Sequence, residues 1–494
     1  MSTAARRKER SRISDPVSTA PSSPGDRYLG TANRLIPTMR RLLLLTALAL
    51  VAVPASAQAA STVVVRGAGF GHGIGLSQYG AYGYAQKGFS YQSILSRYYT
   101  STTLTKAPER PVRVLLQASD PYVRFRGASV ASGGKRLNPT VTYRVVPAAG
   151  GGVKLTARGK SMGTFPAPLR VERKGQALRL MGKAINGVTG GTYRGALELR
   201  GGTAGGVTAV NSLPVDQYVQ GVVAGEMPSG WDMAALQAQA VAARTYGLAT
   251  RKAGGVFDQY PDTRSQVYRG MVSETARSNQ AVSSTSRQIL TYGGVPAITY
   301  FFSTSGGETE DVENSFVGST PKPWLKARLD PYDAISPKHR WGFRFSPASI
   351  GAKLGAPGKF KKVSVIQRGK SPRIVRARVY GSGGTRVLTG PQIRARLGLY
   401  DTWAYFTGIS TSQVRHAKGA HAAAASVFPE LAGRFDPAPK GRALIVERRV
   451  KGTWKRVSQL STTRAGRYAT TLSSPGAYRV RAGTVAGPAV RIKG

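Results

Sequence analysis

Residues 211–250 read NSLPVDQYVQGVVAGEMPSGWDMAALQAQAVAARTYGLAT and join an apolar, strand-like run to an Ala-rich run. The Ala-rich part, from Trp231 onward, predicts a helix because Ala has the highest helix propensity and no Pro interrupts the run. Ser229 and Asp232 stand three residues apart before it, which favours an N-cap with a weak capping box. One carboxylate, Glu226, lies between the two runs. The stretch therefore predicts a strand, a loop carrying a single acid, and a long helix.

The predicted helix is almost free of charge, with only Asp232 and Arg244 carrying any. A helix so poor in charge, in a chain of formal net charge +48, is expected to be buried on most sides. A buried Arg244 needs an anionic partner, and Glu226 or a bound anionic substrate is a candidate. A direct pair would lower the pKa of Glu226. This favours placing Arg244 against the substrate or against a backbone turn.

The composition of the chain limits its chemistry. The 494 residues suffice for two or three domains and contain no Cys, which excludes disulfides, thiolate metal sites and cysteine nucleophiles. Only four His occur, so a zinc site is not expected, and a Ser-His-Asp triad would have to use His72 or His339. No metal or other cofactor is expected. The net charge predicts an extended anionic partner.

Residues 1–60 are predicted to be an extended signal peptide. Arg40 and Arg41 precede an apolar run at 42–53, and an Ala-x-Ala pattern follows at 55–57. The apolar run is short for a membrane span, so secretion to the cell wall is expected rather than anchoring. A buried core helix is the alternative, which the abrupt Ala-x-Ala ending disfavours. An exported protein is not expected to bind nucleic acid, so anionic cell-wall polymers are the expected partner.

Five glycines alternate with other residues between positions 67 and 75, with His72 among them. Alternating glycines let the backbone pass close to a ligand or to another surface. His72 is interpreted either as a substrate-contacting group or as a structural hydrogen-bonding residue in a tight loop. Ser77 and Ser90 are expected to cap two short helices that follow.

The rest of the chain predicts an α+β protein. Short β-type runs separated by Gly-rich turns predict a β-rich part at about 110–210, inserted in a catalytic domain at 61–410. An apolar strand at 296–302 runs into hydroxyls and paired glycines, from Ser303 and Ser305 onward. Such a strand end suits binding of ligand oxygens, although a Ser/Thr turn would use the same residues. Residues 411–440 are expected to be a linker and 441–494 a small β-sandwich-like domain.

Four blocks together resemble the stage II sporulation protein D and amidase-enhancer family of bacterial cell-wall proteins. The resemblance covers roughly residues 61–407, and its blocks are GAGFGHGIGLSQYGAYGYAQKGFSYQSILSRYY, NSLPVDQYVQGVVAGEMPSGWDMAALQAQAVAARTY, SQVYRG with FFSTSGGETEDVEN, and LTGPQIRARLGLYDTWAYF. The resemblance implies lytic cleavage of peptidoglycan glycan strands, preferably strands stripped of stem peptides. It implies that Glu226 of the E-M-P turn is the catalytic acid. It also implies substrate contacts by Arg244, Ser303 and Ser305. His72 and Gln78, from the glycine-rich block, are further candidate substrate-binding residues.

Three departures from the family pattern stand out. The glycine-rich block usually follows the L-G-L-x-S-T-W-F block but here comes first, so the domain reads as circularly permuted. Its end near Phe406 must then lie close to its start near Arg66. Gln237 replaces a Lys that the family often has. The substrate contact made by that Lys is therefore in question, and Gln237 is the candidate residue to make it. Asp216 replaces the commoner Glu, a milder change.

A glycosidase that uses water generally needs two carboxylates, whereas a lytic transglycosylase needs one, because the sugar supplies its own nucleophile. Glu226 alone therefore fits a lytic transglycosylase that leaves 1,6-anhydro-muramic ends, with a pKa raised by partial burial. Asp232, Glu308 and Asp311 are the candidate second carboxylates for a hydrolase. A noncatalytic wall-binding protein that stimulates a partner amidase is the alternative from another class.

Overall fold

The structure, a computed structural model, describes residues 62–202, 205–252, 254–413, 430–436, 441–464, 466–483 and 485–492. These residues form a mixed α+β protein rich in β-strands, as the sequence predicts. The predicted signal peptide lies outside the described residues. Within the described part of the chain, no helix is both long and apolar enough to cross a bilayer.

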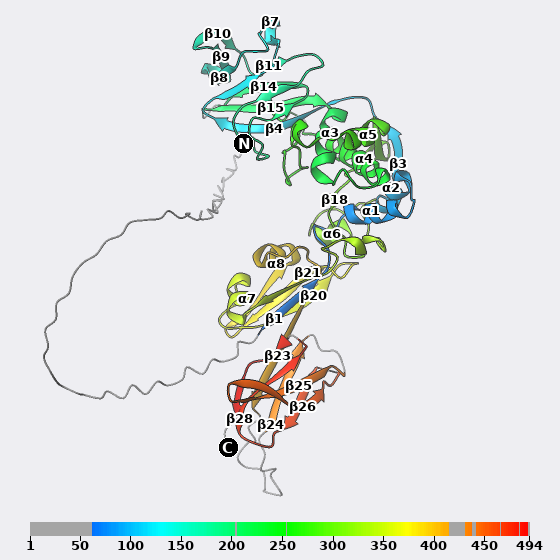
Figure 1. Ribbon diagram of the computed structural model, residues 1–494, viewed down its shortest axis with the longest axis vertical. Helices are drawn as coiled ribbons and strands as arrows, with labels where there is room; N and C mark the ends of the chain where they lie inside the picture. The colour runs from blue at the N-terminus through cyan, green and yellow to red at the C-terminus, as the bar shows by residue number, and fades with distance from the viewer. Residues whose placement is uncertain are drawn as a thin grey trace, which may run out of the picture. The chain divides into compact units, whose positions relative to one another are not determined.

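The β-rich part predicted at about 110–210 holds two six-stranded sheets, drawn in cyan to green in Figure 1. The first has the order β10 (Lys160–Phe165), β9 (Val153–Ala157), β8 (Tyr143–Pro147), β5 (Val123–Arg126), β12 (Leu178–Leu180) and β13 (Thr192–Tyr193). The second has the order β4 (Pro111–Asp120), β15 (Val207–Pro214), β14 (Ala196–Gly201), β11 (Leu169–Glu172), β6 (Val130–Ala131) and β7 (Lys135–Arg136). Alternate side chains such as Val145, Leu155 and Leu199 are fully buried, which gives the sheets a common core.

The prediction of a strand from residue 211 up to Glu226 is wrong for most of that stretch. Strand β15 ends at Pro214, and the chain continues as helix α3 (Val215–Glu226). Val215, Tyr218, Val219 and Val222 are all buried, which is the three-to-four spacing of a helix face rather than the alternation of a strand. The β-branched residues suggest a strand locally, and packing overrides that preference.

Helix α4 (Met233–Ala249) confirms the predicted helix, and it is buried on most sides as expected. It contacts α1 (Gln78–Gln86), α2 (Tyr91–Tyr98), α3 and α5 (Ala276–Ser284), and also β16 (Gln288–Tyr292), which pairs with β3 (Thr103–Lys106) and β17 (Val295–Pro296). Figure 1 shows these helices gathered around α4. Asp232, not Ser229, is the N-cap residue, and its side chain makes no capping hydrogen bond, so the predicted capping box is wrong. The caps predicted at Ser77 and Ser90 are confirmed.

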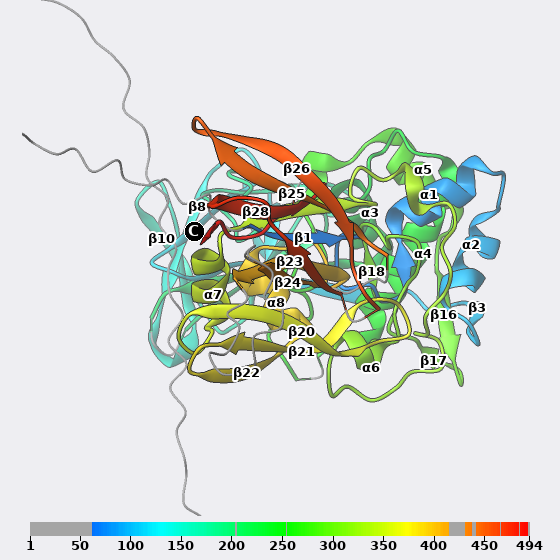
Figure 2. The same cartoon turned by 90° about the horizontal axis from the view of Figure 1, so that it is seen from below.

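A second core surrounds β1 (Val63–Gly67), which lies between β19 (Trp341–Phe345) and β23 (Ala404–Gln413). Arg66 pairs with Tyr405 and Val65 with Phe406, so the two ends of the predicted domain meet as the permuted order requires. The same core holds β20 (Phe360–Arg368), β21 (Ile374–Gly381) and β22 (Gly384–Thr389), with α7 (Pro347–Leu354) and α8 (Gly390–Leu397) packed against them, as Figure 2 shows from below.

The C-terminal residues form two sheets around one apolar core. One continues from β23 through β24 (Glu430–Asp436) to β27 (Arg467–Thr471); the other has the order β26 (Thr453–Ser461), β25 (Ala443–Val450), β28 (Gly476–Ala482) and β29 (Val485–Ala486), with β30 (Val490–Ile492) on β28. The predicted linker at 411–440 is therefore wrong in part. Strand β23 runs past residue 410 and β24 pairs with it, because buried Leu431 and Phe435 belong to this core. Residues 414–429 and 437–440 of the predicted linker lie outside the described residues.

Candidate functional site

Glu226 is the last residue of α3 rather than part of a loop. The helix ends there because Met227 is extended and Pro228 follows, and a residue before proline is disfavoured in the helical region. Gly221 and Gly225 lie one helical turn apart and face residues 267–270. A Cβ on Gly225 would lie 2.9 Å from the carbonyl oxygen of Val267, so the glycine permits a very close approach. This approach brings the backbone of Val267 within reach of Glu226.

The carboxylate of Glu226 is half-buried and accepts two hydrogen bonds. The Val267 N–H donates to Oε1 at 2.7 Å, and the Gln78 amide donates to Oε2 at 3.5 Å and to the Glu226 carbonyl at 3.2 Å. Burial raises the pKa of Glu226, and these two donors oppose the rise in part. No charged side chain in the described part of the chain is among the groups that shift this pKa. The site thus favours a proton on Glu226 at higher pH than an ordinary glutamate would hold it.

Gln78 is the first residue of α1, directly after the N-cap Ser77. The two predicted residues Gln78 and Glu226 come from segments 148 positions apart, and the structure brings them together. The side chain of Gln78 is buried, which fixes its amide beside the carboxylate.

An aromatic cluster formed by α1 next to Gln78 and by Trp231 was not predicted from the sequence. The ring of Trp231 stacks on Tyr82 with a centroid separation of 4.5 Å and an interplanar angle of 5°, and it meets Tyr79 edge-on at 4.8 Å. All three side chains are partly exposed. Arg277 holds the segment by donating to the Trp231 carbonyl at 2.8 Å. The available signal was the spacing of Tyr79 and Tyr82 on one helix face next to Gln78.

The Gly225→Ala variant is expected to be less stable than the wild type. Alanine in a helix normally stabilises, but here the new methyl group would press on Val267, and such overpacking costs about 1–3 kcal/mol. Chemical denaturation measures the change in the free energy of unfolding. Gly230→Ala is the matched control, since a Cβ there meets nothing within 4 Å. Equal stability of the two variants would contradict the close approach of α3 to Val267.

The substrate contact predicted for Arg244 is corrected by the structure. The guanidinium is fully buried and donates from Nε to Asp216 at 2.5 Å, from Nη1 to the Gln288 carbonyl at 3.1 Å and from Nη2 to the Val282 carbonyl at 3.2 Å. Its anionic partner is therefore Asp216 on α3, not Glu226 and not a substrate. Arg244 ties α4 to α3 and α5.

Gln237 lies on the side of α4 that faces α5. Its amide donates to the Ser284 hydroxyl at 2.9 Å, and the side chain remains partly exposed. In the described part of the chain, the Gln237 side chain makes no hydrogen bond to Glu226 or Gln78. A substrate contact by Gln237 stays a prediction.

Of the two serines predicted to bind sugar oxygens, Ser303 is partly exposed and Ser305 is buried. The strand predicted at 296–302 is shorter, with β18 (Phe301–Phe302) pairing in parallel with β2 (Leu76–Ser77). Ser303 is partly exposed, and its carbonyl accepts the Tyr79 N–H at 3.0 Å, which places it one residue from Gln78. Ser305 is fully buried, and its hydroxyl accepts the Gly307 N–H at 3.0 Å. Ser305 is therefore structural, and the predicted sugar contact is wrong for it.

A buried acidic pair beneath this turn was missed in the sequence. Asp333 accepts from the N–H groups of Ser305 and Gly306 at 2.8 and 2.9 Å, and its Oδ2 lies 2.8 Å from Nδ1 of His339. Asp330 accepts from the Tyr98 hydroxyl at 2.9 Å. Burial first, and then the charge of Asp333, raises the pKa of Asp330 to about 7. The pair anchors the Ser303 turn to the helices that carry Gln78.

The free energy of unfolding is expected to fall between pH 4 and pH 7 because of Asp330. Over that range the unfolded chain loses the proton while the folded chain keeps it, so each pH unit costs stability, by about 4 kcal/mol in total at most. The Asp330→Asn variant lacks this titration, so its stability relative to the wild type should rise with pH up to about 7. Denaturation curves at several pH values measure the difference.

Asp262→Asn is a control of opposite sign, because Arg264 lowers the pKa of Asp262. Its stability relative to the wild type should fall as pH rises through the acid range. A difference between Asp330→Asn and the wild type that does not change with pH would contradict the buried protonated state of Asp330.

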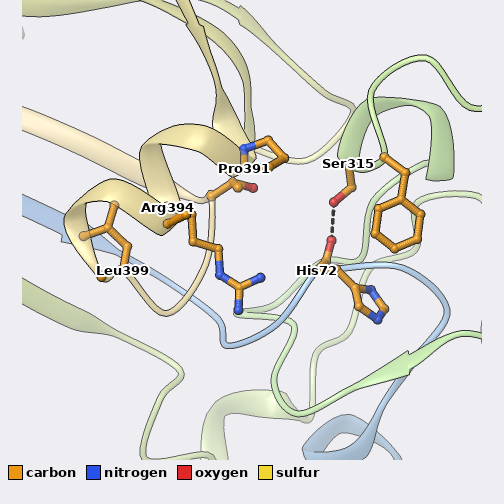
Figure 3. Close-up of a pocket in the computed structure, with 9 residues that line it drawn as sticks. His72, Ser315, Pro391, Arg394 and Leu399 are labelled. Atoms are coloured by element: carbon orange, nitrogen blue, oxygen red, sulfur yellow. Dashed lines mark hydrogen bonds between the residues drawn. The ribbon is translucent and has the colours of Figure 1, made fainter. Parts of the chain in front are cut away.

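The contacts of the His72 side chain in the described part of the chain include neither Glu226 nor Gln78. Its Nδ1 accepts the Ile74 N–H at 3.1 Å, and its ring contacts Tyr300, Phe302 and Phe316. Burial, and then the positive charge of Arg394 and Arg373, lowers the pKa of His72 to about 3, so the ring is neutral. The alternating glycines pass close to protein: a Cβ on Gly73 would lie 2.4 Å from Arg373. His72 lines a pocket with Arg394, shown in Figure 3.

Among the described residues, no second carboxylate contacts Glu226 or shifts its pKa. Asp232 is exposed at the start of α4, and Asp311 accepts the Ala327 N–H at 2.7 Å. Neither these nor Glu308 is among the groups that shift the pKa of Glu226. The described residues also hold no cluster of three or more His, Asp or Glu side chains suited to a metal ion.

Comparison with known proteins gives a family match. Residues 203–292 match the family model described as "Stage II sporulation protein", a stretch that contains Glu226 and Arg244. Stage II sporulation protein D of Bacillus subtilis (strain 168) is 35% identical over 210 residues, covering 39% of this chain and 60% of that protein. The same-named protein of Bacillus amyloliquefaciens is 33% identical over 210 residues, covering 39% and 59%.

The amidase enhancer of Bacillus subtilis (strain 168) is 36% identical over 136 residues, covering 27% of this chain and 18% of that protein. No solved structure matches the chain. The chain spans about 60% of the length of the two sporulation-protein relatives. Residues 203–292 therefore carry a stage II sporulation protein domain, and the chain is similar to stage II sporulation protein D over 210 residues.

Proposed function

We propose that this protein is a secreted lytic transglycosylase that cleaves the glycan strands of peptidoglycan. The observation that carries the proposal is Glu226, a half-buried carboxyl with a raised pKa and with two neutral hydrogen-bond donors. A general acid for glycoside cleavage needs this combination, since it must hold a proton near neutral pH and yet reach the substrate.

Glu226 would act twice in the reaction. Its carboxylic acid donates a proton to the glycosidic oxygen as the bond from that oxygen to C1 of the muramyl residue breaks. The C6 hydroxyl of the same residue attacks C1, and the carboxylate of Glu226 takes the hydroxyl proton. The product carries a 1,6-anhydro end, the acid is restored, and no water is consumed. The absence of a second carboxylate from the groups that influence Glu226, among the described residues, supports this route over hydrolysis.

The groups around Glu226 suit a carbohydrate. Trp231, Tyr79 and Tyr82 present partly exposed aromatic faces next to Gln78, which contacts Glu226, and the apolar face of a sugar ring can lie on them. Gln78 holds Oε2 of Glu226 and would keep the carboxyl group oriented. Ser303 offers a hydroxyl on the adjoining segment for a sugar hydroxyl or N-acetyl group.

The expected location is the cell wall, outside the membrane. The Ala-x-Ala pattern at 55–57 predicts export, and the formal net charge of +48 favours anionic wall polymers as partners. The name of its relatives suggests a role in sporulation, and in a bacterium that does not sporulate the role would be wall remodelling.

The test identifies the chemical structure at the ends of the glycan fragments that the protein releases. Purified glycan strands, with and without stem peptides, are incubated with the protein and the fragments are analysed by mass spectrometry. The expected fragments end in 1,6-anhydro-muramic acid. Reducing ends would instead identify a hydrolase and would direct attention to Glu308 or Asp311 as the second carboxylate.

A second candidate is a noncatalytic protein that binds wall glycan and stimulates a partner amidase. The observation that favours it is the 36% identity over 136 residues to a protein named amidase enhancer. Tight binding to glycan strands without any released fragment, together with faster turnover of a wall amidase, would support this candidate over the enzyme.

A further inference from the structure

The C-terminal β-domain has a strongly one-sided charge. Residues 441–494 contain twelve Lys or Arg and a single acidic residue, Glu447. Its strands β26, β25 and β28 are neighbours in one sheet and lie side by side in Figure 2. Leu444, Val446 and Val480 of this sheet point into the apolar core. Because side chains alternate along a strand, the residues between them lie on the opposite, outer face of the sheet.

The register of the strands identifies the residues of this outer face. Glu447 lies opposite Arg479 on one side and opposite Arg456 on the other. Directly opposed residues of antiparallel strands share a face, so these three and their alternate neighbours lie together. The face carries five arginines against the one carboxylate of Glu447, a net of four positive charges: Arg449, Arg456, Arg479, Arg481 and Arg491. We call this surface the basic face.

Glu447 holds two of these arginines in place. Its carboxylate accepts from Nε of Arg479 at 2.6 Å and from Nε of Arg481 at 2.9 Å. Nη1 of Arg481 also donates to the Gly483 carbonyl at 2.7 Å. In the described part of the chain, neither Nη of Arg479 nor Nη2 of Arg481 donates to any residue. Both guanidinium groups are therefore fixed while N–H donors remain for a ligand.

Trp454 fixes Arg479 from a second side. The guanidinium carbon of Arg479 lies 4.4 Å from the centroid of the Trp454 ring, a cation–π contact. Both side chains are partly exposed, so the fixed group stays in reach of solvent. A side chain that is held before the ligand arrives loses less conformational entropy on binding. The centre of the basic face is thus organised in advance for an anion.

The remaining charges of the basic face extend this centre into an array. Arg456 donates to the neutral Gln459 amide oxygen at 2.9 Å, and Arg491 is exposed. Residues 441–494 contain no further carboxylate for them. Residues on one face lie roughly 7 Å apart along a strand and about 5 Å apart between neighbouring strands. A matching partner is a flexible chain with one negative charge in every short repeat.

Phosphodiester groups fit this array better than the carboxylates of wall peptides. The planar fork of a guanidinium binds two phosphate oxygens at once. A polyol chain joined by phosphodiesters carries a charge in each repeat of its backbone, whereas wall peptides carry amino groups beside their carboxylates. Charge complementarity therefore favours the phosphate polymer.

We propose that the basic face binds a polyol-phosphate polymer of the cell wall and so holds the protein in the wall. The proposal rests on the export included in the proposed function, and it does not depend on the chemistry of Glu226. Nucleic acid offers the same phosphate groups, and the experiment below separates it from the wall polymer.

The test measures binding of the full chain to insoluble walls. Glu226→Gln protein, which leaves the wall intact, is sedimented with purified walls before and after hydrofluoric acid has removed their phosphate polymers. Intact walls should bind about tenfold more tightly, as expected for a few charge-assisted contacts at an exposed surface. Adding Arg479→Gln with Arg481→Gln should remove most of this preference.

Two further pairs of variants complete the test. Arg456→Gln with Arg491→Gln should lose part of the preference, and these residues make no ion pair within the described residues, so the fold is not affected. Arg464→Gln with Arg467→Gln is the matched control. It removes the same charge from exposed residues in the turn before β27 and on β27, in the other sheet, and should keep the preference. Thermal denaturation checks the folding of each variant.

Three results would overturn the proposal. The first is equal binding to intact and stripped walls. The second is a control pair that weakens binding as much as the basic-face pairs, since the affinity would then reflect overall charge. The third is displacement from walls by a single-stranded oligonucleotide at a lower phosphate concentration than by soluble poly(glycerol phosphate), which would identify a nucleic-acid site.

Failure of this proposal is separate from failure of the proposed function. The release of anhydro-ended fragments is measured on purified glycan strands, which contain no phosphate polymer. Anhydro products without a preference for intact walls reject the basic face alone, and a clear preference without any fragments rejects the enzyme alone.

Discussion

Replacement of Glu226 by Gln is expected to abolish the release of anhydro-ended fragments, with a fall in rate of about 10²–10⁴-fold. The amide cannot donate a proton to the glycosidic oxygen and cannot take one from the C6 hydroxyl. It keeps the size of the side chain, and its oxygen can still accept the Val267 N–H that now lies 2.7 Å from Oε1. The fold should therefore survive while the chemistry is lost.

The measurement is the rate at which fragments appear from glycan strands, followed by mass spectrometry. Glu308→Gln is the matched control, since Glu308 is also half-buried and would be essential only in a hydrolase. The control should cleave at close to the wild-type rate. Unchanged cleavage by Glu226→Gln would remove Glu226 from the mechanism, and loss of activity in both variants would point to a two-carboxylate enzyme.

Replacement of Arg244 by Met should lower the free energy of unfolding by about 3 kcal/mol, because it breaks a largely buried ion pair and leaves Asp216 without its cation. The carbonyls of Gln288 and Val282 also lose their donors. Asp216 is about 25% exposed on its side-chain surface, so water recovers part of the loss. The effect still exceeds that of most single substitutions.

Chemical denaturation measures this change, and Arg251→Met is the control. Arg251 lies just beyond the same helix and pairs with Asp258 at 3.8 Å, with 33% of its side chain exposed, so its loss should cost less than about 1 kcal/mol. An Arg244→Met protein as stable as the wild type, but with weakened glycan binding, would restore the substrate role that the sequence suggested for Arg244.

Local patterns predicted the helical elements well where capping and periodicity agree. Ser77 and Ser90 start helices as expected, and the run at 233–249, in which Arg244 is the one charged residue, forms the buried α4. The same rules were wrong for 215–226, where β-branched residues suggest a strand but buried Tyr218 and Val222 follow a helix face. The local patterns also missed β24. Its Leu431 and Phe435 are buried because β24 pairs with β23 and β27, which are separate segments of the chain.

The sequence by itself identified Glu226 as the candidate acid. Glu226 stands between a glycine and the Met-Pro pair, ahead of a helix that is almost free of charge, and the four blocks around it carry the resemblance to the family. The proximity of Arg66 to Tyr405 also follows from the order of those blocks.

Only the tertiary structure decided which other residues surround that acid. Arg244 and Ser305 are buried and structural, whereas Gln78 lies beside Glu226 and the ring of Trp231 stacks on Tyr82 of α1, because α1 packs on α4 from more than 140 positions away. The pairing of Arg244 with Asp216, and of Arg373 with Asp401, is likewise set by packing between separate segments rather than by local pattern.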